Sequence, residues 1–236
     1  MVWWRSSDDS TTNPTSVEFS SSSARRERVD VSDGGGEDDE VQGAGIALDP
    51  RRMEAFSDSV MAVIITIMAF NLKTPVTANW HGLAGRMASI LVYILSFTFV
   101  GIYWNNHHHL LRATRRISAV VMWSNLILLF WLSLIPFATA WVGSDPDRAL
   151  PAATYGVVAL GSALAFFVLS RSILRANADD LAIRRAIGRS TKAVISPIVY
   201  VLGCALAFVT PSLAYICYAG VALVWIIPDR RLAKGA

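Results

Sequence analysis

Six apolar segments constrain this chain more than any other feature of its sequence. They cover residues 53–72, 84–106, 117–141, 151–170, 192–209 and 211–228. A helix that crosses the hydrocarbon core of a membrane needs about 20 mainly apolar residues, with a usual range of about 17–25. The sequence therefore predicts an all-α membrane protein, with six transmembrane helices per subunit in a domain over residues 51–236 and with lipid around it. The last two segments meet at Thr210-Pro211, so a tight helical hairpin is expected there.

The basic residues fall mainly on one side of this predicted domain. Six spans place the N-terminus, the loops after the second and fourth helices, and the C-terminus on the same side. That side carries these basic residues: Arg51, Arg52, Arg112, Arg115, Arg116, Arg171, Arg175, Arg184, Arg185, Arg189, Lys192, Arg230, Arg231 and Lys234. The other side carries Lys73, Arg86 and Arg148. Because positive charge concentrates on the cytoplasmic side, both termini are predicted to be cytoplasmic.

Residues 1–50 have the opposite character. They are rich in Ser, Asp, Glu and Gly, including the acidic run 33–40. Such a segment buries too little apolar surface to offset the entropy of ordering the chain. It also lacks the apolar core of a signal peptide, since charge follows soon after its first residues. We expect a disordered, acidic, cytoplasmic tail.

The composition excludes several classes of function. The net charge is +3 at pH 7, and the positive charge lies in short clusters between apolar segments, so no nucleic-acid partner is expected. Cys204 and Cys217 both lie in apolar runs, which predicts neither a disulfide framework nor a metal site. An enzyme would need a convergent nucleophile, base or metal set, and the spans offer little beyond Asp58 and His107. We therefore expect no catalytic residues and no cofactor.

The first span carries ionisable residues at its start. An ionisable side chain inside a spanning helix costs a few kcal/mol, so it normally faces protein or water and has a partner. Arg52 and Glu54 lie near the helix end, where a long side chain can also extend to the interface. Asp58 lies deeper, and we expect it to have a polar partner.

The same span has two faces. At about 100° per residue, one stripe holds Phe56, Ser59, Val63, Thr66 and Phe70. The polar residues Ser57 and Asp58, which lie between Phe56 and Ser59 in the sequence, point away from this stripe. One face is thus suited to line a narrow apolar passage and the other to contact neighbouring helices, although ordinary packing of a transmembrane helix produces the same stripe.

Three sequence motifs resemble one known family. The first is Arg52-x-x-x-Phe56-Ser57-Asp58 at the start of the first span, and the second is Trp104-Asn105-Asn106-His107 at the end of the second. The third is Asn125 with Ile135-Pro136-Phe137 in the third span. Together these motifs are similar to those of the endosomal/lysosomal potassium channel family (transmembrane protein 175 type). The resemblance covers residues 51–141.

The resemblance implies a potassium-selective channel that conducts ions passively. Single-repeat prokaryotic members of the family are tetramers, so this chain is expected to form a homotetramer in a prokaryotic cell membrane. Its pore would be lined by the first helix of each subunit, without a carbonyl filter. Selectivity for K⁺ then comes from rings of side chains at a constriction. A proton-conducting channel remains the main alternative, and a secondary transporter is a weaker one, since the sequence has no internal repeat and Pro136 is the obvious midspan breaker.

Residue roles also follow from the resemblance. The apolar gate is assigned to Val63, a position where the family usually has Ile or Leu. A layer of hydroxyl groups is assigned to Thr66 and a third layer to Phe70. Ser59 completes the pore-lining set. A polar network behind the pore wall, which holds the first helix in register, is assigned to Arg52, Phe56, Ser57, Asp58, Trp104, His107 and Asn125. Histidines occupy the three consecutive positions 107–109. Adjacent residues on a helix point about 100° apart, so the three side chains cannot all reach one ion, and no metal site is predicted there.

Overall fold

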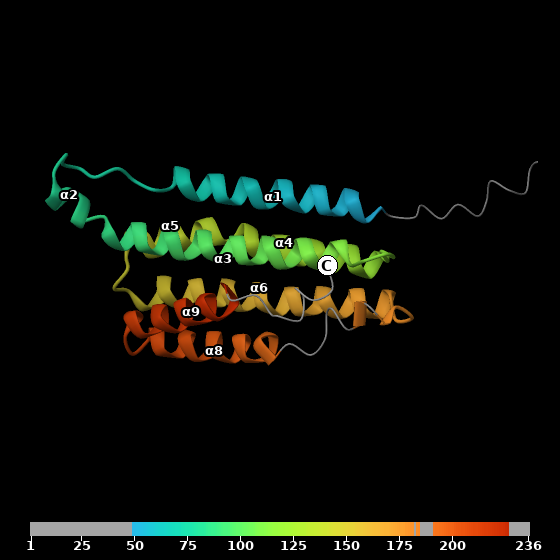
Figure 1. Cartoon of the computed structure of the whole chain (residues 1–236). Coiled ribbons are helices and arrows are strands. Elements are labelled where there is room, and N and C mark those ends of the chain that lie inside the picture. The colour runs from blue at the N-terminus through green and yellow to red at the C-terminus, as the bar shows by residue number, and fades with distance from the viewer. Residues whose placement is uncertain (1–48, 182, 185–190, 227–236) are drawn as a thin grey trace, which may run out of the picture. The chain divides into compact units, whose positions relative to one another are not determined.

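The structure is a computed structural model, and it describes residues 49–181, 183, 184 and 191–226. Every regular element within these residues is a helix (Figure 1). The helices are α1 (Pro50–Phe70), α2 (Trp80–Ala84), α3 (Met87–Arg112), α4 (Ala119–Ser133), α5 (Ile135–Ser144), α6 (Ala149–Ala176), α8 (Thr191–Ala207) and α9 (Pro211–Ile226). All of them belong to one compact unit, Ala44–Ala236. The predicted tail, apart from residues 49 and 50, and the basic residues Arg185, Arg189, Arg230, Arg231 and Lys234 lie outside the described residues.

Among the described residues, four helical segments are long and apolar enough to cross a membrane. They are Pro50–Phe70, Met87–Arg112, Ala119–Ser144 and Ala149–Ala176. Helices α8 and α9 are also apolar, but they have 17 and 16 residues and so are shorter than the usual span of about 20. The predicted all-α membrane fold is therefore confirmed, whereas the count of six spans stays a prediction. Helices α8 and α9 form the expected hairpin, with only residues 208–210 between them.

The helix ends follow local sequence signals. Asp49 caps α1 by accepting a hydrogen bond from the backbone N–H of Arg51 at 2.9 Å, and Pro50 occupies the first turn. Ser118 caps α4 in the same way, accepting from the backbone N–H of Val121. Helix α3 begins at Met87, later than predicted, and continues to Arg112, past the predicted end at residue 106. The three histidines at 107–109 are therefore all helical, as expected.

The third predicted span is interrupted in the middle. Helix α4 ends at Ser133 and α5 begins at Ile135, with a turn at Leu134. Pro136 explains the break, because proline lacks the N–H that would bond to the carbonyl four residues earlier and its ring clashes with that carbonyl. Pro197 lies inside α8 without ending that helix.

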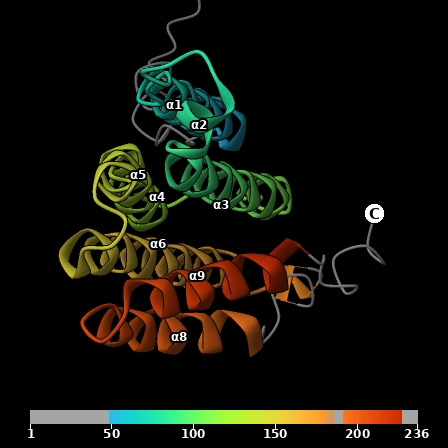
Figure 2. The ribbon, with the colours of Figure 1, turned by 90° about the vertical axis from the view of Figure 1, so that its left-hand side faces the viewer.

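Helix α6 lies between two layers of helices. It contacts α4 and α5 on one side and α8 and α9 on the other (Figure 2). Helix α1 packs against α3, α4 and α5, at the opposite edge from α8 (Figures 1 and 2). The residues of α1 that are buried in this packing are Ser57, Met61, Ile64 and Met68. Only one face of α1 is therefore packed against the other helices.

Small residues of α6 allow its neighbours to approach closely within one chain. A Cβ atom added to Gly161 would overlap the ring of Trp131 from α4. A Cβ atom added to Gly156 would overlap the Tyr218 hydroxyl of α9 and meet the Cys204 sulfur of α8. These glycines are therefore used by contacts inside the subunit.

We expect Gly161→Ala to lower the free energy of unfolding by about 1–3 kcal/mol, because the added methyl group overfills the contact with Trp131. The midpoint of thermal unfolding in detergent measures this loss. Gly101→Ala is the matched control, since a Cβ atom there meets no atom within 4 Å. Equal midpoints for the two variants would contradict the close packing of α4 on α6.

Candidate functional site

One face of α1 is left uncovered by the rest of the chain. The side chain of Val63 is 55% exposed and that of Phe70 is 84% exposed, whereas Ile64, next to Val63, is 3% exposed. Phe56, Ser59 and Thr66 are exposed as well. All five residues of the predicted stripe therefore share the exposed face of α1, opposite the face that packs on the other helices. An uncovered apolar helix face of this length is expected to contact lipid or protein, or to line a narrow passage.

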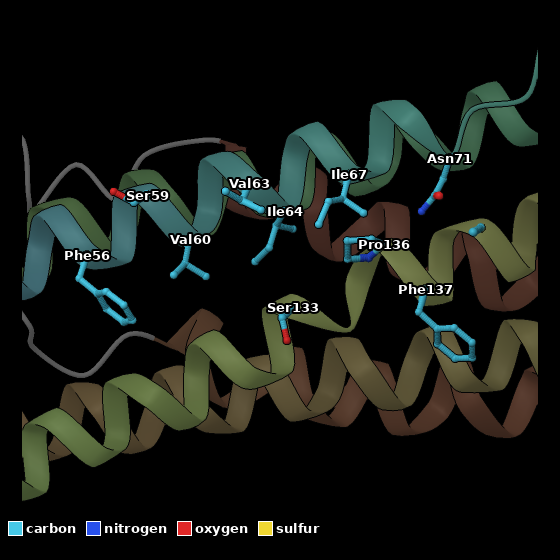
Figure 3. Close-up of a pocket in the computed structure, with 11 residues that line it drawn as sticks. Phe56, Ser59, Val60, Val63, Ile64, Ile67, Asn71, Ser133, Pro136 and Phe137 are labelled. Carbon is cyan, nitrogen blue, oxygen red and sulfur yellow. The ribbon is translucent and has the colours of Figure 1, made fainter.

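The uncovered face borders a groove of about 720 Å³ between α1 and the α4–α5 break. Phe56, Ser59 and Val63 of the stripe line this groove, and Pro136 and Phe137 line it from α5. Figure 3 shows the side chain of Phe56 pointing from α1 across the groove. The predicted pore residues Thr66 and Phe70 lie on the same helix face but are not among the groove-lining residues.

Two hydroxyl groups lie on the exposed face. Ser59 donates a hydrogen bond from Oγ to the carbonyl oxygen of Ala55 at 2.8 Å, and Thr66 donates from Oγ1 to that of Ala62 at 2.9 Å. Each hydroxyl hydrogen is therefore committed to the helix backbone. The oxygen of each group keeps its lone pairs and can accept a hydrogen bond or contact a cation.

A buried hydrogen-bonded trio joins three helices at the start of α1. Asn125 of α4 donates from Nδ2 to the Ser57 hydroxyl at 2.9 Å, and its Oδ1 lies 2.7 Å from Nε2 of His107 on α3. Because a carbonyl oxygen only accepts, Nε2 of His107 is the donor. Ser57 in turn donates to the carbonyl oxygen of Met53 at 2.8 Å. All three residues of the trio are at most 1% exposed, so these bonds replace contacts with water.

The other residues assigned to the polar network lie around this trio without joining its hydrogen bonds. Asp58 has a buried carboxylate oxygen, Oδ1, that has no hydrogen-bond partner among the described residues. Trp104 is 44% exposed, and its ring stacks on that of His108 with centroids 5.8 Å apart. Phe56 faces the groove, and Arg52 is exposed. No ion pair within the described part of the chain links Arg52 to Asp58.

A close contact beside the trio was not expected from the sequence. Oε1 of Glu54 lies 2.7 Å from Nδ1 of His108 and 3.7 Å from Nε of Arg112. It thereby joins the start of α1 to the end of α3. The available signal was the helix spacing: Glu54 and Asp58 are four residues apart, so both lie on the side of α1 that meets α3. A second buried set, in which Thr139 donates to Ser96 at 2.7 Å and Ser96 pairs with Tyr155, had no signal in the sequence.

Comparison with known proteins identifies what the chain is similar to. The family described as Endosomal/lysosomal potassium channel TMEM175 matches residues 52–136. A potassium channel of Chryseobacterium sp. (strain P1-3) is 46% identical over 183 residues, which are 78% of this chain and 95% of that relative. A potassium channel of Streptomyces collinus (strain DSM 40733 / Tue 365) is 31% identical over 198 residues, 77% of this chain and 96% of the relative.

A solved structure has the same fold. It is the crystal structure of a lysosomal potassium-selective channel TMEM175 homolog from Chamaesiphon minutus, with a TM-score of 0.66. The likeness covers 75% of this chain and 96% of that one, at 24% sequence identity. The helices described above are therefore arranged as in that protein.

We expect Asn125→Leu to lower the free energy of unfolding by about 1–3 kcal/mol, because the buried Nε2–H of His107 then loses its acceptor. Leu has nearly the shape of Asn, so little packing changes. Asn105→Leu makes the same substitution at an exposed position and should leave the unfolding midpoint in detergent nearly unchanged. If the two variants unfold alike, the trio does not hold the three helices together.

Proposed function

This chain belongs to the endosomal/lysosomal potassium channel TMEM175 family and is an integral membrane protein, and on that premise we propose that it conducts potassium ions passively through a central pore. The observation that carries this proposal is the uncovered face of α1, which is apolar apart from the hydroxyl oxygens of Ser59 and Thr66. A helix facing only lipid has no need of outward oxygen atoms. A helix lining a narrow passage can use them to replace part of the hydration of an ion.

The pore requires more than one copy of the chain. A single helix cannot enclose a pathway, and α1 at the edge of the bundle offers an uncovered stripe to the α1 helices of other copies. We therefore propose a homotetramer in which the four α1 helices surround the pore. Val63 forms the hydrophobic constriction, Thr66 the adjacent ring of oxygen atoms, and Phe70 the last layer, while Ser59 lines the passage on the side of the trio.

The rotation of α1 decides which of its residues face the pore. Successive residues on a helix point about 100° apart, so a small rotation would exchange Val63 for Ile64. The hydrogen bond from Asn125 to Ser57 and the 2.7 Å contact of Glu54 Oε1 with His108 Nδ1 hold α1 against α4 and α3. We propose that Ser57, His107 and Asn125 serve conduction in this indirect way, with Asp58, Arg52, Phe56 and Trp104 around them, and do not touch the ion.

The charge distribution supports an orientation in the membrane. The pair of Glu54 with Arg112 brings the start of α1 and the end of α3 together, and Arg116 bonds through its backbone to Asn177 after α6. The basic residues near these ends thus gather on one side of the bundle, and Lys73, Arg86 and Arg148 lie at the other ends of the same helices. By the positive-inside rule we place the basic side, with both termini, in the cytoplasm of a prokaryotic cell.

Potassium fits the uncovered face better than a proton does. A proton path needs titratable side chains or water along its length, and the stripe from Phe56 to Phe70 contains none that titrates. Asp58 lies on another face of α1, near His108 of α3, and His107 of α3 is bonded to Asn125 of α4. A transporter is the third candidate. Transporters bind their substrates at interrupted helices, and the chain is interrupted at Leu134 between α4 and α5.

Reversal potentials of the purified protein in planar bilayers test the proposal. With a potassium gradient across the bilayer, the reversal potential should move toward the potassium equilibrium potential, and a proton gradient alone should not move it. Native mass spectrometry of the same preparation should give about four times 25.7 kDa. A reversal potential that follows the proton gradient would establish the proton channel instead, and flux only when a second solute moves would establish a transporter.

We expect Val63→Asn to raise the potassium conductance and to weaken discrimination against sodium. Four amides would then replace four apolar side chains at the constriction, which lowers the barrier to wetting the passage. Ile64→Asn is the control, because Ile64 is 3% exposed and its substitution should impair folding without opening the pore. A rise in single-channel current for Ile64→Asn but not for Val63→Asn would show that another face of α1 lines the pathway.

A further inference from the structure

Three side chains from two helices converge at the start of α1, beside the buried trio. Glu54 and Asp58 are one helical turn apart on α1, and His108 comes from α3. One carboxylate oxygen from each acid and one ring nitrogen of His108 all lie within 4.8 Å of one another. The side chains of Glu54 and His108 are 19% and 22% exposed, so the cluster is largely covered but still reachable from solvent.

Two atoms of the cluster are buried without a hydrogen bond in the described part of the chain. One is Oδ1 of Asp58. The other is Nδ1 of His108, which lies 2.7 Å from Glu54 Oε1 but without the alignment of a hydrogen bond. Burying such atoms unpaired is costly, and native proteins normally pair them with a donor, a water or an ion.

The cluster also carries more negative than positive charge close by. The carboxylates of Glu54 and Asp58 lie near enough to act electrostatically on the buried ring of His107. Arg112 approaches Glu54, with Nε 3.7 Å from Oε1, but its side chain is 68% exposed, so this contact is mostly solvated. A cation placed between the three ligand atoms would neutralise both acids.

The ligand types select the kind of cation. Imidazole nitrogen favours first-row transition ions such as Zn²⁺, whereas Ca²⁺ and Mg²⁺ favour six or more oxygen ligands. The ring of His108 is held in place by stacking on Trp104, at an interplanar angle of 23°. We propose that Glu54, Asp58 and His108 form a binding site for a divalent transition metal ion of the zinc class, with water completing the coordination. The site would fasten α1 to α3, and it does not depend on what the pore conducts.

Binding of Zn²⁺ to the full-length protein, free of any affinity tag, tests the proposal. Equilibrium dialysis in detergent should detect one high-affinity Zn²⁺ per chain. Glu54→Gln and His108→Gln should each weaken this binding by about tenfold or more, since even outer partners of metal ligands contribute that much. Unchanged thermal unfolding of the metal-free variants would show that the loss is not a failure to fold.

Two further variants distinguish the site from general attraction of zinc to histidine. His109→Gln removes the neighbouring exposed histidine, which is not one of the three ligands, and should leave the affinity unchanged. Arg112→Gln removes the cation beside Glu54 and should strengthen binding. The proposal is overturned if His108→Gln binds Zn²⁺ as the unmodified protein does, if His109→Gln loses binding equally, or if Ca²⁺ binds as tightly as Zn²⁺.

Discussion

The arrangement of α1 depends on the buried amide of Asn125. This side chain links α1 to α4 through the Ser57 hydroxyl, and it links α4 to α3 through the ring of His107. Because all three groups are shielded from water, the bonds cannot be exchanged for solvent contacts when the helix turns. The rotation of α1 is thereby restricted, and with it the choice between Val63 and Ile64 as the residue facing outward. Apolar packing alone specifies rotation less strictly, since dispersion contacts have little directionality.

Helix α1 therefore combines two chemistries along its length. Its first turns carry charged and hydrogen-bonding groups that meet α3 and α4, among them the pair of Glu54 with His108. Its later turns expose apolar residues such as Val63 and Phe70, of which Val63 lines the groove beside the α4–α5 break. In a membrane this division places the polar contacts near the interface, where charge is least costly, and the apolar stripe in the hydrocarbon core. A metal ion among Glu54, Asp58 and His108 would strengthen the first region without entering the second.

The features that differ from the sequence-based predictions have specific physical causes. The extension of α3 to Arg112 was missed because hydropathy ends where polar residues begin, although a helix can continue into the interface. Pro136 was identified as a midspan breaker, but residues 117–141 were still predicted as one span because the run of apolar residues is continuous there. The trio was expected only from the family resemblance, and the cluster with His108 was not expected at all. Both join residues far apart in the chain, and periodicity within one helix carries no information about its partner.

The sequence by itself determined the helical membrane fold, the faces of α1 and the family. These follow from local properties: the length of apolar runs, a rotation of about 100° per residue, and a few motif residues. Only the tertiary structure decided that Gly156 and Gly161 serve contacts inside the subunit, that Asn125 reaches both Ser57 and His107, and that Glu54 and Asp58 meet His108. Those outcomes depend on how helices pack, and packing is set by the shapes of side chains from several helices at once, which no single segment of sequence contains.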